Sequence, residues 1–392
     1  MFKYLFTRDT FLATIMVFLL MGLLSLIPFN THVLDPIKLA LQDFDYNDMA
    51  YSQFNKNSHT GVDTNIVVVN IEDAGRAEIA AMVQKVVAQK PRVVGVDVVF
   101  NEPKDPQTDS TLINVFTANK QVVLAYNLSV EDGQAKAEGF LYSKLSQKGY
   151  ANFVGEAGGT IRYFAPVFKS GNAGFQSFTS AMMQIESPAK QATFEKRFSG
   201  TAQINYSRTA DKYITLSGRD LLNDEADASL LTGKMVLLGY VAADPYSIED
   251  KHFTPLNKKS VGKSVPDLAG VYVHANILSM VNSGEYVSKW PGWLVWTLAV
   301  ILCWLHMALF IRYFLDKHIW FHLVAKIAQL ISAILIVYLG LLFFYKWDIK
   351  INLTPSFVAI ILAVDVLYFY EALVAWLHKK FGFHSLFVHH GH

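Results

Sequence analysis

Long apolar stretches lie at both ends of this chain, and a region that mixes apolar and charged residues separates them. The first stretch covers Phe11 to Phe29, and three more follow one another at about Trp293–Ile311, Phe321–Phe344 and Phe357–Leu377. Each provides about the 20 residues that an α-helix needs to cross roughly 30 Å of hydrocarbon. We predict one transmembrane helix ahead of the mixed region and a group of three behind it.

Two basic residues, Lys3 and Arg8, precede the first apolar stretch, as they would in a secretory signal sequence. The stretch is longer than the roughly 7–15 apolar residues of a signal peptide, and no A-x-A-like cleavage site follows it. We therefore predict an uncleaved signal anchor. Removal of this segment as a signal peptide is the alternative.

The orientation of the helices follows from the distribution of basic residues. After an even number of crossings, the side that carries Lys3 and Arg8 also carries Arg312, Lys317, Lys379 and Lys380. The opposing short loop contains only Lys346 and Lys350. By the positive-inside rule, both termini are expected in the cytoplasm.

This orientation predicts five segments. Residues 1–10 form a cytoplasmic N-terminus, 11–29 the transmembrane anchor, 30–289 a domain outside the cytoplasm, 290–378 three transmembrane helices and 379–392 a cytoplasmic tail.

Four ionisable residues lie within the predicted spans: His306, Lys326, Asp365 and Glu371. Charged groups in a bilayer are costly and are therefore candidates for function. Lys326 and Glu371 are expected at similar depths on antiparallel helices, where they could neutralise each other, whereas Asp365 has no obvious partner. Helix packing with snorkelling, a proton or ion path, and a contact for another membrane subunit are the alternatives.

The mixed region alternates short apolar runs with stretches of helical periodicity. The runs Ile66–Ile71, Val93–Phe100 and Gln121–Tyr126 are typical of strands buried on both faces, and helices are expected at Arg76–Gln89 and Asp109–Asn119 between them. Strands and helices that alternate with short loops imply right-handed crossovers and a parallel sheet.

Further elements follow in the same region. Tyr150–Phe153 and Thr160–Phe168 are predicted to form a hairpin turned by residues 155–159. Another buried strand is expected at Lys234–Gly239, and a helix that leads toward the membrane at Gly270–Met280.

Carboxylates stand where a parallel sheet binds its ligands, beyond the carboxyl ends of the strands. Glu72 and Asp73 follow the first strand, and Asp97 lies inside the second predicted strand. Because residues 70–75 do not match G-x-G-x-x-G, a dinucleotide site is disfavoured. Carboxylates would suit a cation or an amine. The alternatives are solvated loop acids, helix caps and, for Asp97, a structural partner.

Composition narrows the chemistry further. The net charge of the 392 residues is +1, which gives no electrostatic case for nucleic acid, and the one cysteine, Cys303, excludes a disulfide framework. His252 and His274 with Asp250 could form a metal or acid–base site, although His274 is expected to hydrogen-bond to backbone instead. Since no nucleophile or metal motif occurs in a suitable context, we expect no enzymatic activity, no cofactor and no bound metal.

These elements, in this order, resemble the CHASE2 family, the extracytoplasmic sensory domain of bacterial membrane receptors. The residues that carry the resemblance are Ile66–Asp73, Gly95–Phe100 with Glu102 and Pro103, Val122–Ala125, Gly149–Asn152, Ile161–Tyr163, Leu231–Gly239, Asp250–Leu256 and Gly270–Asn276. The last two segments are the most specific. The layout of one helix before the domain and three after it is also that of the family.

The resemblance implies an α/β fold: an extracytoplasmic CHASE2-like domain with a mainly parallel sheet, plus four transmembrane α-helices. It implies a multi-pass protein of the bacterial inner membrane whose main domain is periplasmic or extracellular. The chain departs from the family in lacking a Trp-Pro loop after the first strand and in carrying Gly158-Gly159 where Asp-Gly is common. Family members typically continue into a kinase or nucleotide-cyclase domain, and none follows the last helix in this sequence.

The function implied by the resemblance is therefore that of a sensory or ligand-binding module that signals through a separate partner protein in the membrane or cytoplasm. The candidate residues for an unknown periplasmic ligand are Glu72, Asp73, Asp97, Arg162, Asp250 and His274. The alternative is a structural or accessory subunit of a larger complex in the cell envelope.

Overall fold

The computed structural model describes residues 2–26, 45–57, 60–131, 134–153, 159–244, 246–258, 265–316 and 318–388. The chain divides into two compact units. We call residues 41–287 the sheet domain, and residues 1–40 together with 288–392 the membrane unit.

A seven-stranded sheet forms the centre of the described part of the sheet domain. Its strands lie in the order β10–β1–β11–β2–β3–β4, and β5 also pairs with β3. Every pairing is parallel except that of β3 with β4. The strands are β1 (Asp63–Asn70), β2 (Val93–Val96), β3 (Val122–Glu131), β4 (Gln134–Glu138), β5 (Lys148–Tyr150), β10 (Tyr213–Ser217) and β11 (Met235–Gly239).

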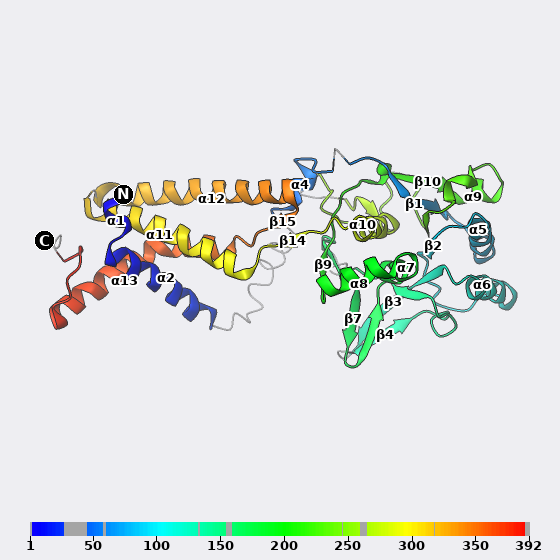
Figure 1. Ribbon diagram of the computed structural model, residues 1–392, viewed down its shortest axis with the longest axis horizontal. Coiled ribbons are helices and arrows are strands. Elements are labelled where there is room, and N and C mark those ends of the chain that lie inside the picture. The colour runs from blue at the N-terminus through cyan, green and yellow to red at the C-terminus, as the bar shows by residue number, and fades with distance from the viewer. Residues whose placement is uncertain are drawn as a thin grey trace. The chain divides into compact units, whose positions relative to one another are not determined.

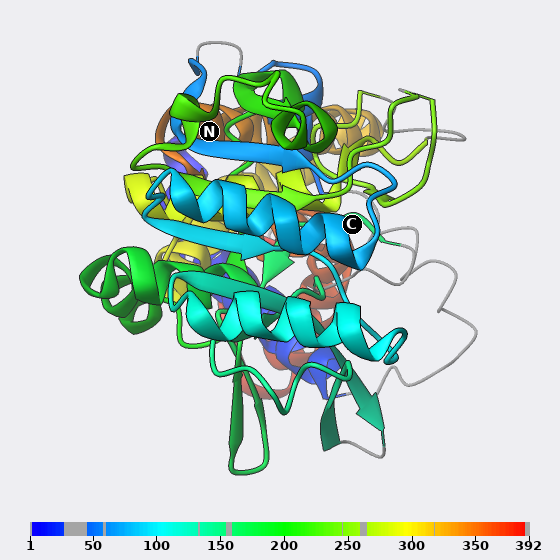
Figure 2. The ribbon, with the colours of Figure 1, turned by 90° about the vertical axis from the view of Figure 1, so that its right-hand side faces the viewer.

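Helices cover both faces of this sheet, which makes a three-layer α/β/α arrangement. Figure 2 shows α5 (Arg76–Ala88) and α6 (Pro106–Ala118) lying across one face. The opposite face packs against α7 (Phe178–Glu186) and α10 (Gly270–Ser283). The four residues Ile66–Val69 of β1 are fully buried, as expected for a strand covered on both sides. The predicted mainly parallel α/β fold is thus confirmed.

Shorter elements complete the sheet domain. They are α4 (Asp48–Ser52), β6 (Tyr163–Phe164), β7 (Val167–Ser170), β8 (Ala173–Gln176), α8 (Pro188–Arg197), β9 (Ala202–Gln203), η2 (Ala210–Lys212), α9 (Gly218–Leu222), η3 (Ala228–Leu231), β12 (Lys251–His252) and β13 (Leu268–Ala269).

Two sequence-based expectations for this domain are wrong. The second strand ends at Val96, so Asp97 lies just beyond the strand rather than inside it. The predicted hairpin does not form: β5 pairs with β3 in parallel, and β6 pairs with β9. Residues 154–158 of the predicted turn lie outside the described part of the chain. In the case of the hairpin, pairing with distant strands replaced the local pattern, because sheet register is set by partners far apart in sequence.

The described part of the membrane unit contains four helices that are long and apolar enough to cross a membrane. They are α2 (Arg8–Ser25), α11 (Gly292–Asp316), α12 (Phe321–Trp347) and α13 (Thr354–Phe381). They confirm the prediction of one apolar helix before the sheet domain and three after it, although residues 27–29 of the predicted first span lie outside the described part. The unit also contains α1 (Phe2–Leu5), β14 (Ser288–Lys289), η4 (His318–Trp320) and β15 (Ile349–Lys350).

Residues from both ends of the chain meet at one end of this helix bundle (Figure 1). Asp9, at the start of α2, is buried and accepts hydrogen bonds from the Tyr370 and Ser385 hydroxyls at 2.7 and 2.6 Å and from the Leu386 backbone N–H at 3.1 Å. These contacts hold residues 382–388, which we call the C-terminal segment, against the helices.

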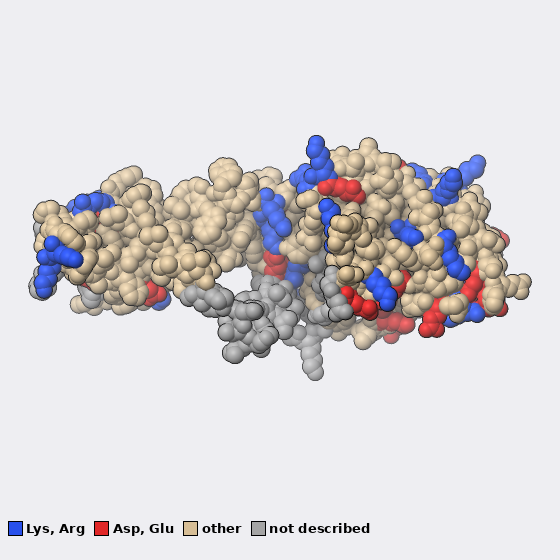
Figure 3. Space-filling view, turned by 90° about the horizontal axis from the view of Figure 1, so that it is seen from below, with Lys and Arg blue, Asp and Glu red and all other residues tan. Residues whose placement is uncertain are grey.

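At the other end of the bundle, β14 pairs with β15 and so joins the start of α11 to the α12–α13 connection. On the face drawn in Figure 3, the middle of the membrane unit is almost free of charged side chains, and Lys and Arg gather near its ends. This distribution is typical of a bundle that sits in a bilayer.

Candidate functional site

The carboxyl ends of β2 and β11 lie side by side, and a group of His and Asp residues surrounds them. Asp97 directly follows β2, where its backbone N–H donates to the Leu238 carbonyl of β11 at 2.8 Å. His274, in the second turn of α10, places Nε2 3.8 Å from Oδ1 of Asp97. The structure therefore brings together two residues that are far apart in the sequence and were both predicted as ligand-binding candidates.

The His274 ring is enclosed by aromatic side chains. Its centroid lies 4.6 Å from that of Phe153 and 5.1 Å from that of Phe178. Only 4% of the residue is exposed. This apolar enclosure separates the imidazole from bulk water.

Asp250 and His252 complete the group from the short strand β12 and the turn before it. The Gly270 N–H, at the start of α10, donates to the Asp250 carbonyl at 3.1 Å. A Cβ at Gly270 would lie 3.3 Å from His252 Nε2 and 3.6 Å from Asp250 Oδ2, so both side chains reach the N-terminus of α10. Phe153 also contacts the His252 ring, with 5.4 Å between the centroids. We call Asp97, Asp250, His252 and His274 the His–Asp cluster.

Burial controls the protonation of His274. Desolvation, with a smaller contribution from nearby His252, lowers the pKa of His274 from 6.5 to about 3. The Asp97 carboxylate alone would favour the protonated ring, but the apolar enclosure outweighs it. The imidazole is therefore neutral at any physiological pH.

The neutral ring leaves one nitrogen without a partner. Among the described residues, Nδ1 of His274 is buried and makes no hydrogen bond. The expected bond from His274 to backbone is thus not formed by Nδ1 within the described chain. Since a neutral imidazole would keep its proton on Nε2, the nitrogen that faces the Asp97 carboxylate, Nδ1 is left as a hydrogen-bond acceptor.

Glu72 and Asp73 lie at a different place, beyond β1 and β10. Glu72 accepts a hydrogen bond from the Ser217 hydroxyl at 2.6 Å, and Asp73 forms an ion pair with Arg219 at 2.8 Å. The Arg219 guanidinium also lies 3.6 Å from Glu72. These contacts join the loop after β1 to the start of α9.

Arg162 lies at a third place. Its guanidinium donates to both carboxylate oxygens of Asp48, at 3.0 Å from Nε and 2.5 Å from Nη2, and both side chains are largely buried. This bidentate pair ties α4 to the segment that leads into β6. The six candidates are therefore not one pocket: Asp97, Asp250 and His274 lie together, and the other three do not join them.

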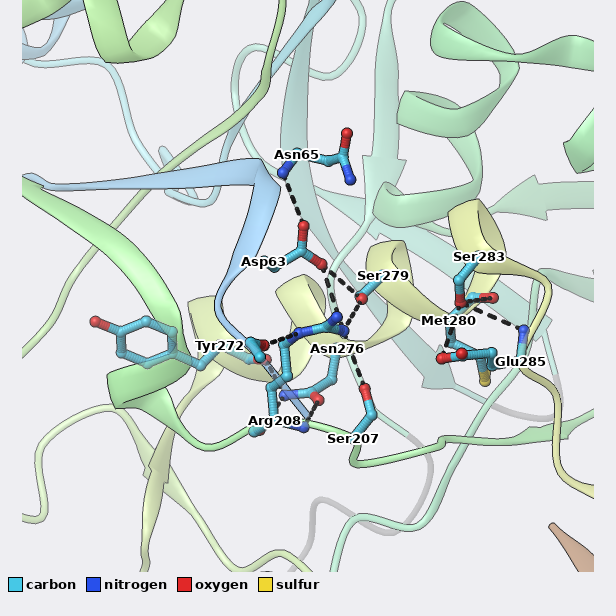
Figure 4. A network of polar contacts seen from close by, with 11 residues as sticks. Asp63, Asn65, Ser207, Arg208, Tyr272, Asn276, Ser279, Met280, Ser283 and Glu285 are labelled. Atoms are coloured by element: carbon cyan, nitrogen blue, oxygen red, sulfur yellow. Dashed lines mark hydrogen bonds and ion pairs between the residues drawn. The ribbon is translucent and has the colours of Figure 1, made fainter. Parts of the chain in front are cut away.

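A buried polar network was not anticipated from the sequence. Figure 4 shows Arg208 beside Asp63 and Ser279: Nη1 donates to the Ser279 hydroxyl at 2.5 Å, and the Ser279 hydroxyl donates to Asp63 at 2.7 Å. Asn276 exchanges hydrogen bonds with the Arg208 backbone at 3.2 and 3.1 Å. The network fastens α10 to the start of β1, and no motif in the sequence links its members.

The four candidate residues in the transmembrane helices also lie at separate places. His306 is buried between α11 and α12, with Nδ1 2.8 Å from the Leu302 carbonyl and Nε2 2.9 Å from the Ser332 hydroxyl, a packing role. Lys326 and Asp365 are exposed on the bundle surface and Glu371 is half-buried. Lys326 and Glu371 form no ion pair among the described residues, so the pairing expected from the sequence is wrong.

No group of three or more His, Cys, Asp or Glu side chains in the described part of the chain is placed to hold a metal ion. The His–Asp cluster offers a hydrogen-bond acceptor and two carboxylates beside an aromatic ring.

The fold defines a class of membrane protein in which an α/β domain is inserted between a first apolar helix and three later ones. The chain belongs to the CHASE2 family, whose CHASE2 domain model matches residues 13–310. CHASE2 domains are extracellular sensory domains. A search of curated proteins and a search of solved structures gave no match.

Proposed function

We propose that this chain is a non-enzymatic, membrane-anchored sensor whose sheet domain binds a small polar ligand at the His–Asp cluster and passes the event to a separate partner protein. The observation that carries the proposal is the buried Nδ1 of His274, which has no hydrogen-bond partner in the described chain, at the strand ends where α/β sheets bind ligands. A buried polar atom without a partner costs free energy, which a ligand donor would recover.

The residues around the His274 ring indicate the class of ligand. Nδ1 accepts a hydrogen bond, Asp97 and Asp250 supply negative charge, and the Phe153 ring can face a cation. A small molecule with an ammonium group satisfies all three features.

The chain itself offers a route from the cluster to the membrane. α10 carries His274 in its second turn, and only residues 284–291 separate its end from the start of α11. The Asp63–Arg208–Ser279 network ties the later part of α10 to the start of β1. A shift of α10 would reach α11 through a connection of eight residues.

The proposal includes a location and a topology. Membership of the CHASE2 family supports a domain outside the cytoplasm, and the bundle carries Asp9 and the C-terminal segment at one end and β14 and β15 at the other. This arrangement, together with the basic residues, supports cytoplasmic termini, a periplasmic domain over 30–289, and the inner membrane as the site of insertion.

The test uses the full chain in lipid nanodiscs and a panel of small ammonium compounds, from monoamines to linear diamines and amino acids. Binding is measured by calorimetry and by the rise in melting temperature. We expect at least one compound to bind, and Asp97→Asn to weaken it at least tenfold, about the value of one charge-assisted hydrogen bond. The matched control is Asp73→Asn, which removes an acid outside the cluster and should leave binding unchanged.

Two results would count against the sensor. One is a ligand whose affinity is unaffected by Asp97→Asn. The other is a protein that binds none of these compounds but co-purifies from its native membrane with stoichiometric partners, identified by mass spectrometry. The second result would favour an accessory subunit of a larger envelope complex.

A further inference from the structure

Two opposite charges stand on the outer surface of the membrane unit without partners in the described chain. Lys326 on α12 and Asp365 on α13 are exposed, and neither makes an ion pair or a hydrogen bond with a described residue. Exposed apolar side chains flank both: Leu323 and Leu330 beside Lys326, and Ile361 beside Asp365. Their surroundings are therefore those of a surface that faces lipid.

Two contacts between the helices show that these charges lie at the same level. The Tyr368 hydroxyl is 2.9 Å from His322 Nε2, and the Gln329 amide donates to the Ile360 carbonyl at 2.9 Å. The helices run antiparallel, so a step of four residues forward from His322 to Lys326 matches four residues back from Tyr368 to Val364. The second contact matches Lys326 with Ala363 in the same way, so Lys326 lies within one or two residues of the level of Asp365, whereas Glu371 lies toward the start of α12.

The spacing of residues along α12 and α13 also places both charges at the boundary between the two helices, which we call the α12–α13 seam. On α12, residues 322, 326 and 329 have the i, i+4, i+7 spacing of one helix face. On α13, residues 361, 365 and 368 have that spacing too. One side of the seam therefore carries a positive group and the other side carries a negative group at nearly equal depth.

Such an arrangement is complementary to itself. A two-fold axis along the membrane normal keeps every residue at its own depth and sets α12 of one copy opposite α13 of the other. Lys326 of each copy then faces Asp365 of its partner, so the dimer contains two ion pairs and each charge in them is neutralised. We propose that the α12–α13 seam is the interface of a homodimer held by these two reciprocal ion pairs.

The cost of exposing a charge to hydrocarbon favours a second copy of the chain, rather than lipid, at this surface. A carboxylate exposed to hydrocarbon is costly, and the short Asp365 side chain cannot reach the headgroups as a lysine can. A second copy supplies the missing cation at the required depth without any further protein.

The experiment is charge reversal with two differently tagged full-length copies, co-expressed and purified in mild detergent. Lys326→Asp gives a chain with two acids at the seam, and Asp365→Lys gives a chain with two bases. Each should lose self-association by about tenfold. Co-expression of one with the other should restore pairing, because the two acids of one chain then face the two bases of the other. Pairing within one chain cannot produce this rescue, so its absence would overturn the proposal. Lys346→Asp, at the other end of α12, is the matched control and should pair normally.

A second measurement does not depend on charge variants. In a Cys303→Ala background, one tagged copy carries Leu330→Cys and the other carries Ile361→Cys, so any disulfide joins two different chains. We expect oxidation to cross-link them, and Leu19→Cys on the exposed face of α2 to give no cross-link with either. Equal cross-linking at Leu19 and at the seam would contradict the assigned interface.

Discussion

The buried imidazole of His274 makes the stability of the sheet domain depend on pH in a way that can be tested. In the unfolded chain this ring takes up a proton near pH 6.5, whereas in the folded domain its pKa is lowered to about 3. Below pH 6.5 the unfolded state therefore binds a proton that the folded state rejects, and the free energy of unfolding falls as the pH falls. Above pH 6.5 the ring is neutral in both states and contributes no pH dependence.

The size of this pH dependence follows from the difference between the pKa of His274 in the unfolded chain and in the folded domain. Each pH unit within the window from 6.5 down to 3 costs about 1.4 kcal/mol, so the loss between pH 7.5 and pH 5 is about 2 kcal/mol. Asp267 acts in the opposite sense, because burial raises its pKa to about 6 and the folded domain then gains a proton on acidification. The contribution of His274 must therefore be measured as a difference between the protein and its His274→Gln variant.

The assay is pulse proteolysis of the full chain in detergent and urea at pH 7.5 and pH 5. Proteolysis is needed because all seven tryptophans lie at or beyond residue 290, so tryptophan fluorescence reports the membrane unit and serves as the internal control. We expect His274→Gln to be destabilised at pH 7.5 through lost packing, and to lose about 2 kcal/mol less than the unmodified protein on going to pH 5. An equal loss in both proteins would refute the argument from burial.

Three further predictions concern the contacts that hold the fold. Arg162→Ala should destabilise the sheet domain by about 3–5 kcal/mol in the same assay, and removing Asp48 as well should restore part of the loss, because the buried carboxylate is no longer unpaired. Gly149→Ala should cost about 3 kcal/mol, since its Cβ would lie 2.6 Å from the backbone nitrogen at the start of α7, whereas Gly200→Ala, with open space around it, should change stability by under about 0.5 kcal/mol. Asp9→Ala should leave the hydroxyl and N–H donors around it unpaired, at about 1–3 kcal/mol, and should expose the C-terminal segment to protease; unchanged cleavage would contradict its anchoring role.

Much of the fold could be predicted because the sequence patterns that indicate helices and strands are local. Unbroken apolar runs predicted β1 and β11, and helical periodicity predicted α5 and α10, because each pattern is set by side-chain burial within a few residues. The hairpin prediction was wrong because it relied on local sequence alone. Tyr150 ends a strand that pairs with β3, and this pairing depends on the arrangement of the whole sheet rather than on neighbouring residues.

The candidate site was predictable only in part. Asp97, Asp250 and His274 were expected and do come together, but Glu72 and Arg162 were assigned to the same site and are engaged elsewhere by Arg219 and Asp48. Judged by residue type alone, Glu72 and Arg162 were as suitable for ligand binding as Asp97, Asp250 and His274. Only the tertiary structure shows which charges already have a partner inside the protein.

The sequence by itself determined the class of protein: apolar helices at the two ends, a mainly parallel sheet between them, and carboxylates near the strand ends. The tertiary structure decided which of those polar groups face one another, that Nδ1 of His274 is buried without a partner in the described chain, and that Lys326 lies level with Asp365 instead of Glu371. The physical reason is that hydrophobic periodicity acts over one or two turns of chain, whereas hydrogen bonds and ion pairs form between residues that packing brings together from any distance along it.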